Sequence, residues 1–389
     1  MNIDQDIKQY MNYNIIQRGL FIGAFISDLH FPVNNIEPIQ QYQILNEQFL
    51  NKITLMPKLD IIGVLGDIFD HKVLASSDAV LYASMFIGRL VDICRQKNAT
   101  LLILQGTLSH DANQLKLFYH YMDDPYNVDV RIVTTLKFEI VKGCRILCIP
   151  ELYNLDESIY IHYLFGCGFY DLALMHGTFK GAVYGDNSGQ SRLFNINDFN
   201  NCRGPIISGH VHKPNCYNDY FYYCGSPYAW NFDDDHNKGF ILLSYNLDTR
   251  LHYIDWENIK SFKYKTIHIE DIKNNDPQYM IAYIDKIKQE QGIDFIRIIF
   301  GNISKTERLI LSNNYRDNRY VKLQFPETED QIYAKQRATE QNDEYKQYWF
   351  LTDNKLSDEE KFCMYINLLK NDETYISIDE LKQILYGEL

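Results

Sequence analysis

The stretch PIISGHVHKP, residues 205–214, is the most informative part of this 389-residue sequence. A short apolar run ends in a glycine, and His210 and His212 then follow with one residue between them. Because side chains two positions apart on an extended chain point to the same side, both imidazoles can face one cavity. Imidazole is a common ligand of divalent metal ions, and two buried histidines without a metal would cost stability. The pattern therefore predicts a metal site at the end of a strand.

Four further polar clusters lie upstream, and most of them also follow an apolar run. They are Asp28 and His30 after FIGAFIS, Asp67 in GDIFDHK, Ser109 with His110 and Asp111 in GTLSHD, and His176 in LALMHG. Taken singly, each would more often be a solvated turn or a satisfied core side chain. Together they converge on one sheet edge if the runs are neighbouring strands. Mixed carboxylate and imidazole ligation, with Asp67 bridging, suits two divalent ions about 3.5 to 4 Å apart, as in enzymes that displace phosphoryl groups.

Short apolar runs recur through the first 255 residues, and amphipathic helical stretches at 39–53 and 77–96 separate the early ones. This rhythm predicts an α/β class domain, with a β-sandwich flanked by helices. The later runs follow at shorter spacing with hairpin-like turns, which predicts that the second sheet is the more antiparallel one. The runs are residues 21–27, 60–66, 101–106, 145–150, 171–177, 205–210 and 239–245.

The pattern changes after residue 258. Between residues 260 and 325 it reads strand, helix, strand, helix, strand, which predicts a small α+β module closed by Pro326. The rest is acidic and helical, with Ser357 and Ser377 as helix caps and an apolar face on each helix. Those faces need a partner surface, either on this chain or on another protein. The predicted domains are thus residues 1–258, 259–326 and a helical tail at 327–389.

Composition sets further limits. A chain that is 46% hydrophobic and 23% charged can bury a large core, and its eight cysteines lack a CxxC pair, which favours reduced, buried thiols. No apolar run reaches the roughly 20 residues of a membrane span, and no signal peptide is evident, so we expect a cytoplasmic protein, in the host cytoplasm if a phage encodes it. The net charge of −13 speaks against nucleic acid as a partner. From Pro326 onward, however, there are 15 acidic and 7 basic residues, which leaves −5 for residues 1–325.

The order of the motifs, D-x-H, GD, a His-Asp pair, H and GHxH, resembles that of the calcineurin-like metallophosphoesterases. Within that superfamily, GDIFDHK and the segment YYCGSPYAWNFDDDHNKGFILL, residues 222–243, are similar to the SbcD-type DNA repair and recombination nucleases. The resemblance covers about residues 20–325. It implies a metallophosphoesterase sandwich and a manganese-dependent DNA nuclease with exonuclease and endonuclease activity. The implied partners are DNA and an SbcC-type coiled-coil ABC ATPase, and the resemblance also allows a homodimer. The module at 259–326 would then cap the DNA, and the tail would dock on the ATPase.

The resemblance also assigns roles to single residues. Asp28, His30, Asp67 and His212 would hold one ion, and Asp67, His176 and His210 the other, with manganese preferred and magnesium as the alternative. The third motif departs from the family, because GTLSHD replaces GNHD and Ser109 stands where the family has an asparagine ligand. Ser109 or water would substitute, so the second ion should be held more weakly. His110 would donate a proton to the leaving oxygen, with Asp111 as its orienting carboxylate.

Two other functions stay open on this reasoning. A phosphatase or phosphodiesterase for small molecules or proteins explains the site, but it leaves the 134 residues after Asp255 without a purpose. A non-catalytic scaffold of the same fold would agree with the altered third motif, whereas the full set of histidines argues against it.

Overall fold

The computed structural model describes residues 19–33, 36–111, 113–123, 128–152, 155–180, 193–232, 237–268, 276–301, 303–316 and 318–325. The chain divides into two compact units, one of residues 1–299 with 305–323 and the other of 300–304 with 324–389. The predicted boundaries at 258 and 326 stay predictions. The tail at 327–389, with the caps Ser357 and Ser377, lies outside the described residues.

The first sheet has six strands in the order β14-β13-β1-β2-β3-β4. Strands β1 to β4 run parallel to one another, and β13 joins β1 in the antiparallel sense. In register, Ile26 of β1 pairs with Val64 of β2, and Leu65 of β2 pairs with Leu104 of β3. The residues that follow β1, β2 and β3 therefore emerge at the same edge. The strand bounds are β1 (Leu20–Ile26), β2 (Ile61–Leu65), β3 (Thr100–Leu104), β4 (Asp129–Val133), β13 (Gly239–Asn246) and β14 (His252–Asn258).

The second sheet also has six strands, in the order β11-β12-β10-β7-β6-β5. Three of its five pairings are parallel, as in the first sheet, so the prediction of a more antiparallel second sheet is wrong. The connections from β6 to β7 and from β7 to β10 are long enough for parallel crossovers, which short hairpins are not. The bounds are β5 (Lys137–Val141), β6 (Cys144–Ile149), β7 (Leu172–His176), β10 (Ile206–Gly209), β11 (Asn215–Tyr217) and β12 (Phe221–Tyr223).

The two sheets pack face to face over one apolar core, to which Phe25, Leu65 and Leu102 contribute from the first sheet and Ile146 and Leu174 from the second. Alternate residues of β1, such as Ala24 and Ile26, point to the opposite face and enter a second core. Strands buried on both faces read as continuous apolar runs, which is why the sequence shows them so clearly.

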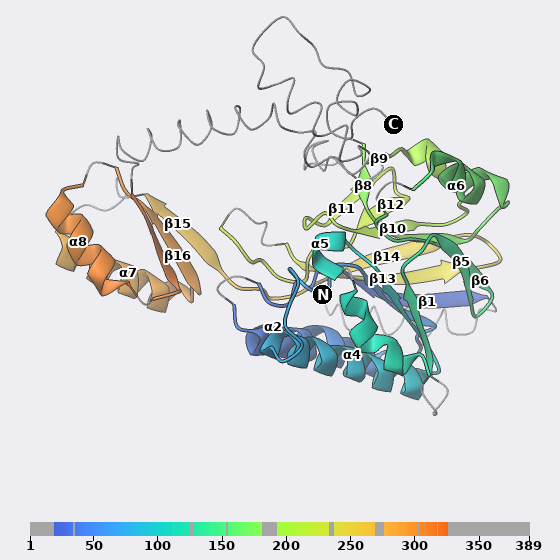
Figure 1. The fold of residues 1–389 in the computed structure, drawn as a ribbon, viewed down its shortest axis with the longest axis horizontal. Coiled ribbons are helices and arrows are strands. Elements are labelled where there is room, and N and C mark those ends of the chain that lie inside the picture. The colour runs from blue at the N-terminus through green and yellow to red at the C-terminus, as the bar shows by residue number, and fades with distance from the viewer. Residues whose placement is uncertain are drawn as a thin grey trace, which may run out of the picture. The chain divides into compact units, whose positions relative to one another are not determined.

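Helices cover both outer faces, as Figure 1 shows. On the first sheet lie α2 (Pro38–Ile44), the π-helical η1 (Leu45–Leu50), α3 (Asn51–Leu55) and α4 (Asp78–Lys97). The Ser77 side chain accepts the N–H of Val80 at the start of α4, and Asn98 in left-handed conformation ends it. The second sheet is covered by α6 (Glu157–Ile161), η3 (His162–Gly166) and η4 (Ile196–Phe199), beside the short pair β8 (Thr178–Phe179) and β9 (Leu193–Phe194). The predicted α/β class is confirmed.

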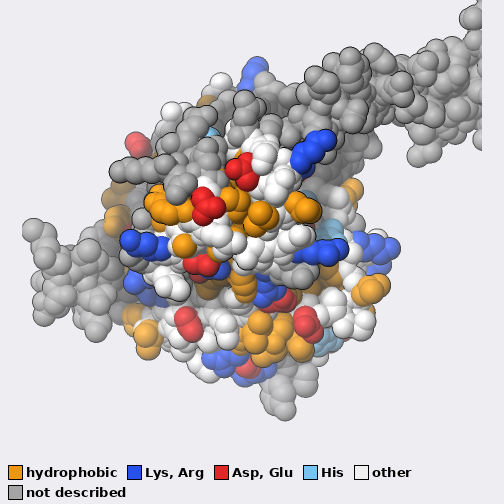
Figure 2. Space-filling model, turned by 90° about the vertical axis from the view of Figure 1, so that its left-hand side faces the viewer, with side chains coloured by type: hydrophobic (Ala, Val, Ile, Leu, Met, Phe, Trp, Pro, Cys, Tyr) orange, Lys and Arg blue, Asp and Glu red, His pale blue; other side chains and the backbone are white. Residues whose placement is uncertain are grey.

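The small module has the predicted order of elements. These are β15 (Tyr264–His268), α7 (Pro277–Gln291), β16 (Phe295–Ile299), α8 (Lys305–Asn314) and β17 (Val321–Gln324), with the sheet order β15-β16-β17. Figure 2 shows one face of the molecule, on which hydrophobic, basic and acidic side chains are interspersed. Tyr279, Leu309 and Ile310 are among the exposed hydrophobic residues of α7 and α8. Within the described residues, no helix has both the length and the hydrophobicity that crossing a membrane requires.

Candidate metal centre

Six strand ends, three from each sheet, bring the polar side chains of the candidate site together. The first sheet supplies Asp28 and His30 after β1, Asp67 after β2, and Thr107, His110 and Asp111 after β3. The second sheet supplies Glu151 after β6, His176 at the end of β7, and His210 and His212 after β10. All six strands present their carboxyl ends here because they run parallel within each sheet.

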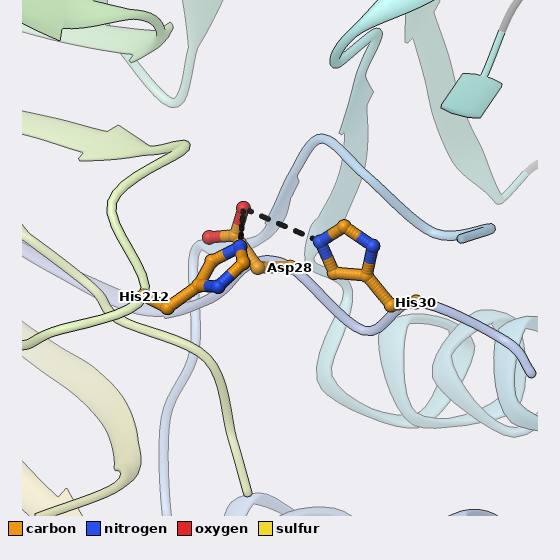
Figure 3. A group of neighbouring side chains, drawn as sticks. All are labelled: Asp28, His30 and His212. Carbon is orange, nitrogen blue, oxygen red and sulfur yellow. Dashed lines mark ion pairs between the residues drawn. The ribbon is translucent and has the colours of Figure 1, made fainter. Parts of the chain in front are cut away.

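One group consists of Asp28, His30 and His212, whose ligand atoms all lie within 4.8 Å of one another. The Asp28 Oδ1 atom is 4.0 Å from His30 Nε2 and 3.9 Å from His212 Nε2, and Figure 3 shows both imidazoles turned toward this carboxylate. Two donors fix the Asp28 carboxylate, namely the Ser27 hydroxyl and the backbone N–H of His210 at 3.1 Å from Oδ1. Residues from both sheets thus form this group.

A second group consists of Asp67, His176 and His210, and Asp67 also belongs to a third group with His30 and His110. The Asp67 Oδ2 atom lies 3.3 Å from His176 Nε2 and 3.7 Å from His30 Nε2. The Nδ1 of His176 donates to the Leu65 carbonyl at 2.7 Å, which leaves Nε2 as the nitrogen that faces Asp67. Asp67 therefore stands between the two sets of histidines.

Asp111 holds the turns of the first sheet together. Its carboxylate accepts the backbone N–H groups of Gly106 and Asp67, both at 2.9 Å, and that of Ile68 at 3.0 Å. Burial and the charge of Asp67 raise the pKa of Asp111 to about 7. His110 Nδ1 is buried, and within the described residues it has no hydrogen-bond partner, so the carboxylate does not orient the ring through this atom. The role of His110 as a proton donor stays a prediction.

Ser109 is exposed on α5 (Leu108–Asp111). Its neighbour Thr107 reaches the site instead. The Thr107 N–H donates to Asp67 Oδ1 at 2.6 Å, and its hydroxyl lies 3.1 Å from Asp67 Oδ2 and 2.8 Å from Glu151 Oε2. The placement gives no support to Ser109 as a ligand.

Glu151, like Thr107, is a site residue that the sequence reasoning missed. It is buried, and its Oε2 atom lies 3.5 Å from His210 Nδ1 and 3.8 Å from His176 Nε2. A signal was present, because Glu151 follows the apolar run RILCIP just as the other site residues follow theirs.

The backbone and the buried nitrogens both fit a bound cation. Asp28, His30, Asp67 and His210 have φ values of 55°, 49°, 53° and 83°, in the left-handed region that residues with a side chain seldom adopt. Such conformations cost about 1 to 3 kcal/mol each and cluster at functional sites. The Nε2 atoms of His30 and His176 are buried without a hydrogen-bond partner among the described residues. Divalent ions between these nitrogens and the carboxylates would satisfy both.

The protonation states of Asp67, His210 and His212 agree with this fit. Burial would raise the pKa of Asp67, but the imidazoles of His176 and His30 more than offset it and hold the pKa well below its usual range. Burial, together with His30, keeps the pKa of His212 well below its ordinary value, and burial with His176 lowers that of His210. His176 is the exception: Asp67 overcomes the effect of burial and raises its pKa, so this imidazole would have to release a proton when an ion binds. An ionised carboxylate and neutral imidazoles are the forms that bind metal ions.

Two glycines allow the turns to approach one another this closely. A Cβ atom on Gly106 would lie 2.2 Å from Asp67 Oδ1, and one on Gly209 would lie 2.0 Å from Ser27 Oγ. Real Cβ atoms do not approach other atoms this closely, so a side chain at either position would displace a residue of the site.

Comparison with known proteins leaves the family open. No protein-family model matches the chain, and no curated protein matches it. Among solved structures, one aligns at 10% identity with a TM-score of 0.36, covering 61% of this chain and 100% of its own. A protein of unknown function from Aquifex aeolicus aligns at 19% identity with a TM-score of 0.21, covering 45% of this chain and 88% of its own. Likenesses this weak carry no argument about function.

Proposed function

We propose that this chain is a two-metal phosphoesterase with the calcineurin-like sandwich, and that it hydrolyses phosphodiester bonds in DNA as the SbcD-type nucleases do. The proposal of a metal site rests on one observation. The Asp67 carboxylate lies between His30 on one side and His176 with His210 on the other. A carboxylate in that position can bridge two divalent ions.

The residues divide between the two ions as follows. Asp28, His30 and His212 would hold the first together with Asp67, while Asp67, His176 and His210 would hold the second. Mixed oxygen and imidazole ligands suit Mn²⁺, with Mg²⁺ as the alternative. When bound, the ions would supply positive charge to the phosphate and activate the attacking water.

The surrounding residues would keep this arrangement rigid. The Trp230 ring lies 4.1 Å from the His30 ring and 4.3 Å from the His212 ring, centroid to centroid, which limits rotation of both imidazoles. Lys238 is almost fully buried, and its Nζ donates to the His212 carbonyl at 2.8 Å and to the Ser226 hydroxyl at 2.9 Å. The His110 ring lies 4.8 Å from that of His30 and would hold the proton for the leaving oxygen.

The choice of DNA as the substrate rests on the resemblance of residues 66–72 and 222–243 to the SbcD-type nucleases. Lys238 and Ser226 belong to the second of these segments, so the contacts above explain what part of it does for the site. The same proposal includes an SbcC-type ATPase as the partner, a possible homodimer, and a DNA-capping role for the module at 259–326.

Cleavage assays with three kinds of substrate test the proposal. The full chain is incubated with Mn²⁺ and single-stranded or duplex DNA, beside a chromogenic phosphodiester and a chromogenic phosphomonoester, with Asp67→Asn as the control variant. The proposal expects metal-dependent DNA cleavage that Asp67→Asn abolishes. Cleavage of the monoester without cleavage of DNA would indicate a phosphatase, and metal binding without any hydrolysis would indicate a scaffold.

A further inference from the structure

We infer that Glu151 is a ligand of the second metal ion, in the role that the asparagine of the family's third motif would otherwise have. This inference rests on the two-metal site proposed above. It completes the second ligand set as Asp67, Glu151, His176 and His210.

The position of Glu151 in the sheet is the first argument. Strand β6 runs parallel to β7, and β7 runs parallel to β10, so the residues after these three strands meet at one edge. Ile149 of β6 pairs with Met175, the residue before His176, which brings Glu151 level with the two histidine-bearing turns. Glu151 thus stands in the second sheet where Asp67 stands in the first.

The distances are the second argument. The Oε2 atom of Glu151 lies 3.5 Å from His210 Nδ1 and 3.8 Å from His176 Nε2, while His176 Nε2 lies 3.3 Å from Asp67 Oδ2. These are the separations expected between ligands that share one ion. The residue is 3% exposed, so its carboxylate is enclosed by the site and not by solvent.

The Thr107 hydroxyl supplies the third argument. It lies within hydrogen-bond distance of both Asp67 Oδ2 and Glu151 Oε2, but a hydroxyl has one proton and can donate to only one of them. Two carboxylates that share such a donor in a buried site repel each other. A cation between them removes that repulsion, and Thr107 then positions the two ligands.

Exchanging an amide ligand for a carboxylate changes the properties of the second site. Asp67 and Glu151 together carry two negative charges, which match a divalent ion, whereas an amide contributes none. The second ion should therefore be held firmly, in contrast to the weak binding predicted from Ser109. A site with more carboxylate also favours Mn²⁺ or Mg²⁺ over ions that prefer nitrogen or sulfur.

Metal binding to the full chain tests the assignment directly. Mn²⁺ is titrated calorimetrically into the metal-free wild type and into Glu151→Gln, and bound manganese is counted after dialysis. The matched control is Glu47→Gln, which makes the same chemical change at an exposed residue of η1. We expect two ions in the wild type and in Glu47→Gln. In Glu151→Gln, one ion should bind at least about tenfold more weakly, because even outer partners of metal ligands contribute about 10- to 100-fold.

Three further measurements keep the outcomes distinct. Thermal unfolding in chelator shows whether Glu151→Gln is folded, and Glu151→Asp, which keeps the charge on a shorter side chain, serves in its place if it is not. Ser109→Ala tests the competing ligand. Unchanged affinity at both sites in the Glu151 variants, fewer than two ions in the wild type, or loss of the second ion through Ser109→Ala alone would each overturn the inference.

The same titrations separate this inference from the proposed function. If the wild type binds two ions and Glu151→Gln loses one, but no phosphoester is cleaved, the ligand assignment stands and the nuclease proposal fails. If DNA is cleaved in a metal-dependent way while the Glu151 variants bind both ions as tightly as the wild type, the nuclease proposal stands and the ligand assignment fails.

Discussion

Replacing Gly106 by alanine should disable the site without replacing a ligand. The added Cβ atom would lie 2.2 Å from Asp67 Oδ1 and 2.3 Å from the Asp67 backbone nitrogen. Carbon and oxygen atoms in contact are about 3.5 Å apart, so the carboxylate must move by about 1 Å. Metal ligands tolerate deviations of about 0.2 Å, and a displacement of about 1 Å can cost about a hundredfold in rate. We therefore expect hydrolysis to fall at least about a hundredfold.

The metal content and the stability of Gly106→Ala give two independent readouts. Because Asp67 faces both histidine groups, manganese affinity should fall at both sites, and overpacking should lower the free energy of unfolding by about 1 to 3 kcal/mol. Gly88→Ala is the control, since Gly88 lies within α4 and its added Cβ would meet the hydroxyl oxygen of Tyr121 at 3.1 Å. It should leave metal binding unchanged and alter stability by at most about 1 kcal/mol. A Gly106→Ala variant with wild-type metal binding and rate would refute the reasoning.

Four other predictions concern the site and the tail. Asp67→Asn should abolish hydrolysis and reduce bound manganese from two ions toward one or none, and a variant with two ions and the wild-type rate would contradict the bridging role. His110→Ala should lose about a hundred- to ten-thousand-fold in rate while metal content persists, because general acids contribute on that scale; loss of metal would make His110 a ligand instead. Ser109→Asn should leave the manganese concentration for half-maximal activity unchanged if Glu151 occupies the position, whereas a lower requirement would favour Ser109. Truncation after Phe325 should yield a folded protein that keeps two ions and its hydrolytic activity but does not co-purify with an SbcC-type ATPase; an insoluble or metal-free product would contradict the docking role.

The sequence predicted that the ligands converge because two local patterns act together. Apolar runs marked the strands, and side chains such as Asp28 and His30, two residues apart, marked the strand ends. Parallel pairing then brings successive strand ends to one edge. The fold class and the placement of six of the predicted ligands follow from these local signals, and GHxH was the most specific of them.

The rest depends on contacts between the sheets, which no local pattern encodes. Glu151 is a single carboxylate after a strand, and its partners His176, His210 and Thr107 come from three other strands. Asp111 adjoins His110 in the sequence, but its carboxylate turns to the backbone N–H groups of the β2 and β3 turns because these buried donors need an acceptor. The parallel pairing of β6, β7 and β10 likewise depends on how the long connections return to the sheet. Residue spacing alone therefore led to the wrong prediction of a more antiparallel second sheet.

Two of the candidate ligand groups span the two sheets, and this gives bound ions a mechanical role. Asp28 and His30 come from one sheet and His212 from the other; Asp67 comes from the first and His176 and His210 from the second. An ion in either group is a cross-link at the open edge of the sandwich, comparable to a reversible disulfide between layers. At a hundred times its dissociation constant, one such ion adds about 2.7 kcal/mol to the free energy of unfolding. The resistance of this fold to heat would then rise and fall with the supply of manganese around it.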